Sequence, residues 1–435
     1  MLLGVLMRTR KKRLLFLYNN WDREHVIIEI FAKRIKKNLD INCYKVGMLD
    51  ADLIKKIIQV RPNIVITFPV ASYRQIIVYK FIKKMFKSII LTYTTEGYLD
   101  LENEEQVKMF CGIFDYSPEL VDYHLFWGNR VSEVLGDKLL EQGKVKNREQ
   151  MTVIGNPMYE KEEIVKLYSH NTLIQTLKSE RKKFKQAVLI VTGFHGGSYE
   201  IQDIVSVGDV VDIKGKSKQQ IMNDPMVKRY LDVAEKEKIY RREYLFKIIE
   251  SAKKYPEVLY IVKYHPQEMM RIRTGQSNWV SYLNVLKGYK NIFVIDQNIP
   301  IGVVFPYCSM LVHYGSTVDM EAYLYKIPTL KFTMISDNDF LVESSNKLGA
   351  TYLEDIFEGT LDLYVDLLLD GKNLFKENAE KERDLDDYMG YRIDQKYTPS
   401  QNLVDFLASD LKFNTLNLSV KDYKELLKFI IRREV

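Results

Sequence analysis

Short strand-like runs alternate with longer segments of helical pattern along this chain, and this alternation constrains its fold more than any other feature. The runs are rich in β-branched and aromatic residues, as buried parallel strands are. In chain order they span residues 13–18, 63–68, 88–93, 123–127, 151–154, 187–192, 258–264, 291–295, 308–312 and 329–332. Strands separated by helices predict parallel sheets. The sequence therefore predicts an α/β protein.

The length of 435 residues exceeds one ordinary hydrophobic core and fits two α/β domains of similar size. A polar, lysine-rich stretch at 169–186 separates the two sets of strands. We expect a Rossmann-like domain over 1–170 and a second over 187–372, both doubly wound, with the carboxyl ends of their sheets facing across a cleft. The helical segment 373–435 is expected to pack back on these domains.

Charge and cysteine usage exclude several classes of protein. The net charge of +6, with 28% charged residues, is mildly basic and lacks the concentrated patch of a nucleic-acid binder. Anionic substrates or a membrane surface fit this charge better. Cys43, Cys111 and Cys308 are far apart and form no CxxC pair, which indicates a reducing cytosol and no structural zinc. We expect a cytoplasmic protein without a signal peptide, because its apolar start precedes the basic residues.

The first expected loop and helix lie near the N-terminus. Residues 19–24 are polar apart from Trp21, and they predict a loop that opens a helix over 25–37.

A histidine and a proline directly follow the apolar run at 258–264. His265 would lie at the carboxyl end of a strand, the edge where open α/β sheets bind ligands, and Pro266 would fix the exit of the chain. A single histidine at such an end is more often a hydrogen-bonded structural residue. The order and spacing of the following motif favour the binding interpretation.

That second motif lies about fifty residues later and also joins a strand to a helix. Gly315, Ser316 and Thr317 form the expected turn, where hydroxyls and free N–H groups favour a phosphate. Glu321, one turn into the helix, is placed to accept hydrogen bonds from ribose hydroxyls. Pro328 limits the length of this helix. The common alternative for the hydroxyl pair is an N-cap.

A glycine-rich loop follows the strand at 187–192. Gly193, Gly196 and Gly197 flank His195 and would allow a backbone to approach the donor or acceptor closely. A tight turn without a ligand is an equally good interpretation.

Four pieces of the first half carry a family resemblance together with these motifs: Trp21–Glu24, Thr95-Glu96-Gly97, Phe126–Gly128 and Ile154–Pro157. The chain resembles the surface carbohydrate biosynthesis proteins, which are GT-B-like. More distantly it is similar to bacterial sialyltransferases, capsule Kdo transferases and CDP-glycerol glycerophosphotransferases. The matching pieces add Arg23, Glu24, Gly97 and Asn156 as further cleft residues.

The resemblance implies a glycosyltransferase of surface polysaccharide biosynthesis, with the first domain on the acceptor side and the second binding the donor. It implies a nucleotide-sugar donor, CMP-linked, and a glycan or lipid-linked acceptor, with neither cofactor nor metal. Glu96 would be the general base, although Thr95 replaces the first of the two acids typical of the sialyltransferase-like groups. His265 would contact the donor phosphate and act as an acid, Ser316 and Thr317 would bind the phosphate, and Glu321 the ribose.

Two other functions stay open. A non-hydrolysing sugar-nucleotide 2-epimerase shares the fold, but would carry more carboxylates and histidines in the first domain. A non-catalytic binding protein of the polysaccharide machinery would explain Thr95. The basic segment Lys421–Arg433 would either contact an anionic membrane or pack on the protein. Asp337–Asp339 is interpreted as a solvated loop without metal.

Overall fold

The structure is a computed structural model with two compact units, each with its own sheet. The first unit comprises Met1–Ile164 and Asn378–Val435, and the second comprises Val165–Glu377. The residues that the structure describes are 11–19, 21–68, 72–94, 101, 104–112, 114, 119–193, 219–220, 223, 225–265, 268–269, 284–313, 318–331, 360–377, 379–391, 396 and 398–412.

The sheet of the first unit has six parallel strands in the order β2-β1-β3-β4-β5-β6. They are β1 (Lys12–Tyr18), β2 (Ile41–Gly47), β3 (Ile64–Thr67), β4 (Ile89–Tyr93), β5 (Tyr123–Phe126) and β6 (Met151–Val153). The connecting helices are α1 (Trp21–Asn38), α2 (Leu53–Val60), α3 (Tyr73–Phe86), α4 (Glu104–Gly112) and α5 (Asn129–Glu141). Strand β1 pairs with β2 on one side and β3 on the other, which makes the carboxyl ends of β1 and β3 the topological switch point.

Five of these strands agree with the sequence prediction within one or two residues at each end. Strand β2 was not predicted, because it lies at the edge of the sheet and its middle residues, 42–45, are exposed or half-buried. Such a strand lacks the continuous apolar run of a strand buried on both faces.

The expected loop at 19–24 is wrong from Trp21 onward, since α1 begins at that residue. The Glu24 carboxylate accepts a hydrogen bond from the backbone N–H of Asn19 at 2.9 Å. The Trp21 ring lies 4.9 Å from that of Tyr18 and 5.7 Å from that of His25. These contacts extend the helix over a polar stretch that looked like a loop.

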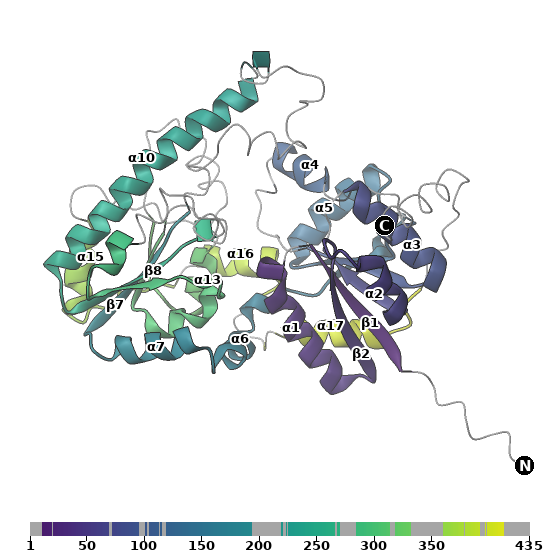
Figure 1. The fold of residues 1–435 in the computed structure, drawn as a ribbon, viewed down its shortest axis with the longest axis horizontal. Coiled ribbons are helices and arrows are strands. Elements are labelled where there is room, and N and C mark those ends of the chain that lie inside the picture. The colour runs from purple at the N-terminus through teal and green to yellow at the C-terminus, as the bar shows by residue number, and fades with distance from the viewer. Residues whose placement is uncertain are drawn as a thin grey trace, which may run out of the picture. The chain divides into compact units, whose positions relative to one another are not determined.

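The last described helices complete the first unit, beside α1 and α5 (Figure 1). They are α16 (Ala379–Met389) and α17 (Pro399–Ala408). Ser400 of α17 donates to the Glu160 carboxylate from its backbone N–H and from its hydroxyl, at 2.5 and 2.8 Å. Arg34 of α1 donates to the Ser400 hydroxyl at 3.0 Å. A segment from the end of the chain is thereby joined to the first helix.

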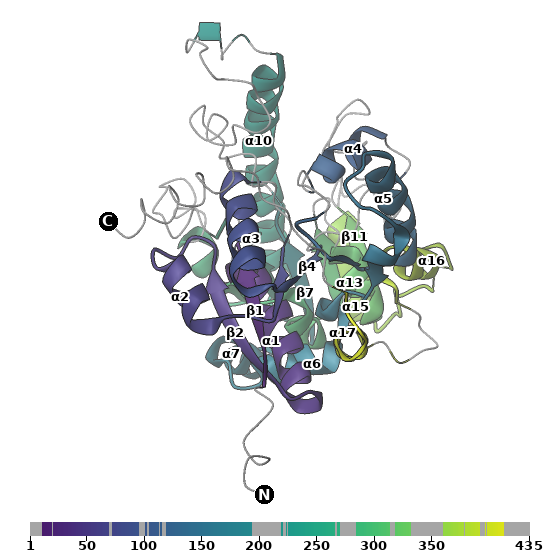
Figure 2. The same ribbon diagram turned by 90° about the vertical axis from the view of Figure 1, so that its right-hand side faces the viewer.

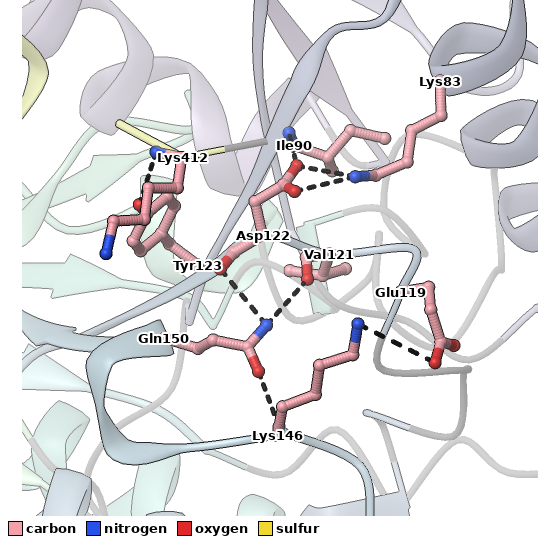
Figure 3. A network of polar contacts seen from close by, with 9 residues as sticks. All are labelled: Lys83, Ile90, Glu119, Val121, Asp122, Tyr123, Lys146, Gln150 and Lys412. Atoms are coloured by element: carbon pink, nitrogen blue, oxygen red, sulfur yellow. Dashed lines mark hydrogen bonds and ion pairs between the residues drawn. The ribbon is translucent and has the colours of Figure 1, made fainter. Parts of the chain in front are cut away.

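A fully buried ion pair lies at the amino ends of β4 and β5 (Figure 3). The Lys83 ammonium donates to both carboxylate oxygens of Asp122, at 2.8 and 2.9 Å. Asp122 also accepts the backbone N–H of Ile90 at 2.7 Å. Gln150 donates to the neighbouring carbonyl oxygens of Val121 and Asp122 at 3.2 and 3.3 Å. These contacts fix the start of two strands.

The sheet of the second unit has five parallel strands in the order β11-β10-β7-β8-β9. They are β7 (Gln186–Val191), β8 (Val258–Lys263), β9 (Ile292–Ile295), β10 (Met310–His313) and β11 (Thr329–Lys331). Its helices include α7 (Thr172–Arg181), α10 (Pro225–Lys254), α13 (Val318–Leu324) and α15 (Thr360–Leu369). All five strands were predicted, because β7 and β8 at the centre are buried on both faces and appear as apolar runs.

The described side chains of α10 that pack on this sheet belong to its carboxyl-terminal half. Tyr244, Leu245, Ile248 and Ala252 belong to one core cluster with Val262 and other strand residues. The amino-terminal half continues beyond the sheet (Figures 1 and 2). Within the described residues, no helix is sufficiently long and apolar to cross a membrane.

Candidate functional site

The strands β7, β8 and β10 of the second sheet are in register at their carboxyl ends. Register pairs Val191 of β7 with Lys263 of β8 and with His313 of β10. His265 follows β8 by two residues, and Gly193 follows β7 by two. Both predicted residues therefore lie at the edge where parallel sheets bind ligands.

A buried carboxylate fixes the backbone of His265. The His265 N–H donates to Glu268 Oε2 at 2.8 Å and approaches the Thr192 hydroxyl at 3.3 Å. Thr192 in turn donates to the same Glu268 oxygen. Glu268 is completely buried, and the Met269 N–H donates to the His265 carbonyl oxygen at 3.0 Å, as in a first helical turn. Glu268 thus joins the ends of β7 and β8, and it fixes the backbone position of His265.

Lys263 and Glu321 form the electrostatic centre of this edge. The Lys263 side chain is 8% exposed, and burial lowers the pKa of its ammonium to about 8 although Glu321 and Glu268 act in the opposite direction. Burial raises the pKa of Glu321, on α13, to about 7 although Lys263 opposes the shift. Both groups therefore titrate near neutral pH. An anion arriving here would change their protonation.

The face of β8 opposite Lys263 is apolar. Val262 and Tyr264 alternate with Lys263, and both belong to the core cluster that contains α10. The Tyr244 hydroxyl of α10 lies 3.2 and 3.3 Å from the carbonyl oxygens of Val191 and Val312. An apolar layer thus supports the sheet beneath the polar edge.

Several predicted site residues lie outside the described residues, and their assignments stay predictions. They are Glu96, Gly97, Gly196, Gly197, Pro266, Gly315, Ser316 and Thr317, and the same holds for Thr95, His195, Asp337–Asp339 and Lys421–Arg433. The described part of β4 ends before them at Tyr93, followed by the buried Thr94.

Glu24, predicted as a cleft residue, lies at the switch point of the first sheet. Its side chain is 3% exposed and closes the turn between β1 and α1 through the Asn19 N–H. The Asn19 side chain donates to the Phe68 carbonyl oxygen at 2.8 Å, which Gln75 also contacts at 2.7 Å. This network ties β1 to β3. The backbone of Arg23 lies in the first turn of α1, whereas its side chain is not among the described ones.

Asn156, the other described cleft residue, is also buried. Its side-chain oxygen accepts the Met158 N–H at 3.0 Å and caps the short 3-10 helix Pro157–Tyr159. The neighbouring Gly155 has φ +94° and accepts a hydrogen bond from the Tyr93 hydroxyl at 2.9 Å. Asn156 thereby shapes the carboxyl end of the first sheet.

Sequence reasoning missed Lys263, Glu268 and Thr192 as site residues. A signal for Glu268 exists, since a proline one residue and a glutamate three residues after His265 match a helix start with a capping box. No comparable signal marks Lys263, because a lysine at the end of an apolar run is usually solvated. Among the described residues, no group of three His, Cys, Asp or Glu side chains could hold a metal ion.

Comparisons with known proteins identify the fold. No protein-family model and no curated protein matches the chain. The structure of the wall teichoic acid polymerase TagF with CDPG matches with a TM-score of 0.50 and 12% identity, over 97% of this chain and 90% of that chain.

Two other solved structures are UDP-GlcNAc 2-epimerases. The enzyme from Neisseria meningitidis, bound to UDP-GlcNAc, gives a TM-score of 0.48 and 11% identity, over 91% of this chain and 99% of that one. The enzyme from Methanocaldococcus jannaschii gives a TM-score of 0.47 and 13% identity, over 85% of this chain and 98% of that one. At 12% identity, the likeness to TagF is one of fold. The predicted α/β fold with two doubly wound, GT-B-like domains is confirmed.

Proposed function

We propose that the chain is a glycosyltransferase that moves a sugar from a nucleotide donor, CMP-linked, onto a surface glycan or its lipid-linked precursor. The observation that carries this proposal is the polar edge of the second sheet, where Lys263 ends the buried strand β8, His265 follows it, and Glu321 lies on the helix after β10. A GT-B-like fold places the nucleotide at such an edge. TagF, the polymerase whose structure was determined with CDPG, has this fold, and its likeness supports a transferase acting on an activated donor.

The chemistry needs a base, a leaving-group partner and a ribose ligand. The acceptor hydroxyl oxygen would attack the anomeric carbon while the bond from that carbon to the phosphate oxygen breaks. Glu96 would take the hydroxyl proton, and the phosphate would leave with the bonding electron pair. His265 would stabilise the departing phosphate as a hydrogen-bond donor or supply a proton to it. Inversion at the anomeric carbon follows from one direct displacement.

Ser316 and Thr317 would bind the donor phosphate, and Glu321 would accept hydrogen bonds from the ribose hydroxyls. Glu321 can accept only through a lone pair, so it serves the ribose in either protonation state but best as the carboxylate. With its pKa raised to about 7, ribose binding through this residue should strengthen as pH rises from about 6 to 8.

The test combines nucleotide binding with turnover. We expect purified protein to be stabilised against heat by CMP or CDP, because a ligand of the native state raises apparent stability. We expect it to release CMP from a CMP-sugar in the presence of an acceptor extract. Resolving the products by chromatography separates sugar transfer from epimerisation, which would return an isomeric sugar nucleotide.

Two variants and one control assign the roles. Glu96→Gln should reduce turnover about 10²- to 10⁴-fold while nucleotide affinity stays unchanged. His265→Ala should weaken nucleotide binding by about 1.5–3 kcal/mol. His170→Ala, at an exposed histidine of the second unit, should change neither. Binding of CMP without release from any CMP-sugar, together with an unaffected Glu96→Gln variant, would identify a non-catalytic binding protein instead.

A further inference from the structure

Among the described residues, two lysines are almost completely buried, and their surroundings differ. Lys83 is bonded to both oxygens of Asp122, at 2.8 and 2.9 Å. Lys263 is 8% exposed, and no hydrogen bond or ion pair joins its side chain to any described residue. Its interactions with Glu321 and Glu268 are electrostatic only. A buried ammonium without a bonded partner is costly, so its retention at this place requires an explanation.

The positions of the two lysines in their sheets also differ. Lys83 and Asp122 lie at the amino ends of β4 and β5, where the pair fixes the start of the strands (Figure 3). Lys263 is the last residue of β8, directly beside Val191 in the register and two residues before His265. The carboxyl edge is the ligand-binding edge of a parallel sheet. The lysine with a bonded carboxylate thus lies away from that edge, and the lysine without one among the described residues lies on it.

The two faces of β8 separate Lys263 from the apolar core. Val262 and Tyr264 point into the cluster with α10, so Lys263 points to the opposite face. Glu321, on α13, is its strongest electrostatic partner, and Glu268 acts from the chain after β8. Glu268 is occupied by Thr192 and the His265 N–H. Glu321 takes no hydrogen bond from any described residue, so neither carboxylate neutralises the ammonium directly.

We propose that the Lys263 ammonium binds a phosphate group of the nucleotide donor and is the charged ligand that the edge of the second sheet provides for it. This inference rests on the proposed function and deepens it. It makes Lys263 a binding residue beside His265, with Glu268 as the positioning residue that holds both strand ends. A phosphate supplies the hydrogen-bond acceptors that the described residues do not provide for the ammonium.

Among the described residues, the charged groups that act on Lys263 are Glu321 and Glu268, and the buried His313 lies two strands away at the same register level. With its pKa lowered to about 8, Lys263 loses its proton as pH rises through that value in the free protein. Glu321 gains negative charge as pH rises through about 7. The loss of positive charge on Lys263 and the gain of negative charge on Glu321 both weaken the binding of an anion. Affinity for phosphate groups should therefore fall between pH 7 and 9, more steeply with Lys263 than without it.

The experiment measures binding and stability of Lys263→Met in the full chain, with Lys83→Met as the matched buried control. The probes are CMP, CDP and UDP, the nucleosides cytidine and uridine, and inorganic pyrophosphate. We expect Lys263→Met to bind the nucleotides and pyrophosphate about 10- to 100-fold more weakly, with nucleoside affinity unchanged. We also expect it to melt at or above the wild-type temperature, whereas Lys83→Met melts well below it.

Each outcome decides between the alternatives. Unchanged nucleotide and pyrophosphate affinity, or a loss of stability like that of Lys83→Met, would overturn the inference while the proposed function stands. Pyrophosphate binding that depends on Lys263, without binding of any nucleotide, would support the anion site and remove the proposed function. Failure of the wild-type protein to bind any of these anions would overturn the inference directly.

Discussion

The buried ion pair of Lys83 and Asp122 in the first unit is satisfied within the protein, and its role is therefore structural. The Lys83–Asp122 pair has no solvent exposure on either side chain, and Asp122 has a third bond to the Ile90 N–H. Burial lowers the pKa of Lys83, whereas Asp122 opposes this shift. Removing one partner would leave an uncompensated charge in the core.

Lys83→Met should therefore lower the free energy of unfolding by about 3–5 kcal/mol. Lys138→Met provides the control, because Lys138 and Glu141 form an exposed pair at 3.0 Å on α5 and should cost less than about 1 kcal/mol. Urea unfolding followed by circular dichroism measures both. Equal effects at the two sites would show that the buried pair contributes no more than a surface pair.

His124, on β5 of the first sheet, is another buried ionisable residue. Its Nδ1 lies 2.9 Å from the Thr92 hydroxyl, and its side chain is 1% exposed. Burial lowers its pKa from 6.5 to about 3, so the imidazole is neutral in the folded protein at physiological pH.

Acid should therefore destabilise the protein through His124. Between about pH 6.5 and 3 the unfolded chain binds a proton that the folded chain excludes, so this residue lowers stability by about 1.4 kcal/mol per pH unit. Above pH 6.5 it contributes no pH dependence. In His124→Gln the side chain does not titrate, so the stability difference between wild type and variant should shift against the wild type as pH falls from 7 to 5. A difference that stays constant over this range contradicts the prediction.

Helices α5 and α16 meet where a glycine allows two backbones to touch. A Cβ added at Gly128, directly before α5, would lie 2.3 Å from the Asp387 carbonyl oxygen and 2.5 Å from that of Tyr388. Gly128 itself has φ −126°, which any residue adopts, so packing alone demands glycine here. The end of α16 cannot move freely, because Gly390 with φ +63° turns the chain beside the Trp127 carbonyl oxygen.

Gly128→Ala should cost at least about 1–3 kcal/mol of unfolding free energy, since backbone atoms must move to admit the methyl group. Gly112→Ala, at the end of α4, is the matched control because a Cβ there meets no atom within 4 Å. That change should be neutral or slightly stabilising. Chemical denaturation of both variants measures the difference. A neutral Gly128→Ala would mean that α16 is not held against α5.

The whole chain is organised so that the first unit is completed by residues from both ends of the sequence. The first unit comprises Met1–Ile164 and Asn378–Val435. Leu385 and Met389 of α16 and Leu403 and Val404 of α17 are buried. Because strands β1 to β6 all precede these helices, the first sheet acquires part of its cover only after the second unit has been synthesised.

Deleting residues 378–435 should therefore lower hydrogen-exchange protection in strands of the first sheet and leave β7, β8 and β10 protected. Peptide-level exchange measured by mass spectrometry distinguishes the two sheets. The substitution Ser400→Ala removes the hydroxyl bonded to Glu160 and Arg34. It should lower hydrogen-exchange protection in the same strands by less than the deletion does. Uniform loss of protection in both sheets would contradict the division into two units.

The strands of this protein could be predicted well, and the candidate site only in part. Central strands such as β7 and β8 are buried on both faces, so their apolar runs are visible in the sequence. His265 and Glu321 lie where the strand-to-helix pattern placed them, although their roles stay predictions. The start of α1 was not predicted, because it lies in a polar stretch where the Glu24 carboxylate accepts the Asn19 N–H. The edge strand β2 was not predicted, because it lacks a continuous apolar run.

The amino-acid sequence by itself determined the α/β class, the two sets of parallel strands and the ends of those strands that carry polar residues, since these follow from local periodicity. The neighbours of each polar residue depend on strand order, which local periodicity does not encode. Only the folded chain brings Glu268 to Thr192, Glu321 to Lys263 and Ser400 to Glu160. These contacts join segments up to 240 residues apart, and they decide which buried polar groups are satisfied within the protein.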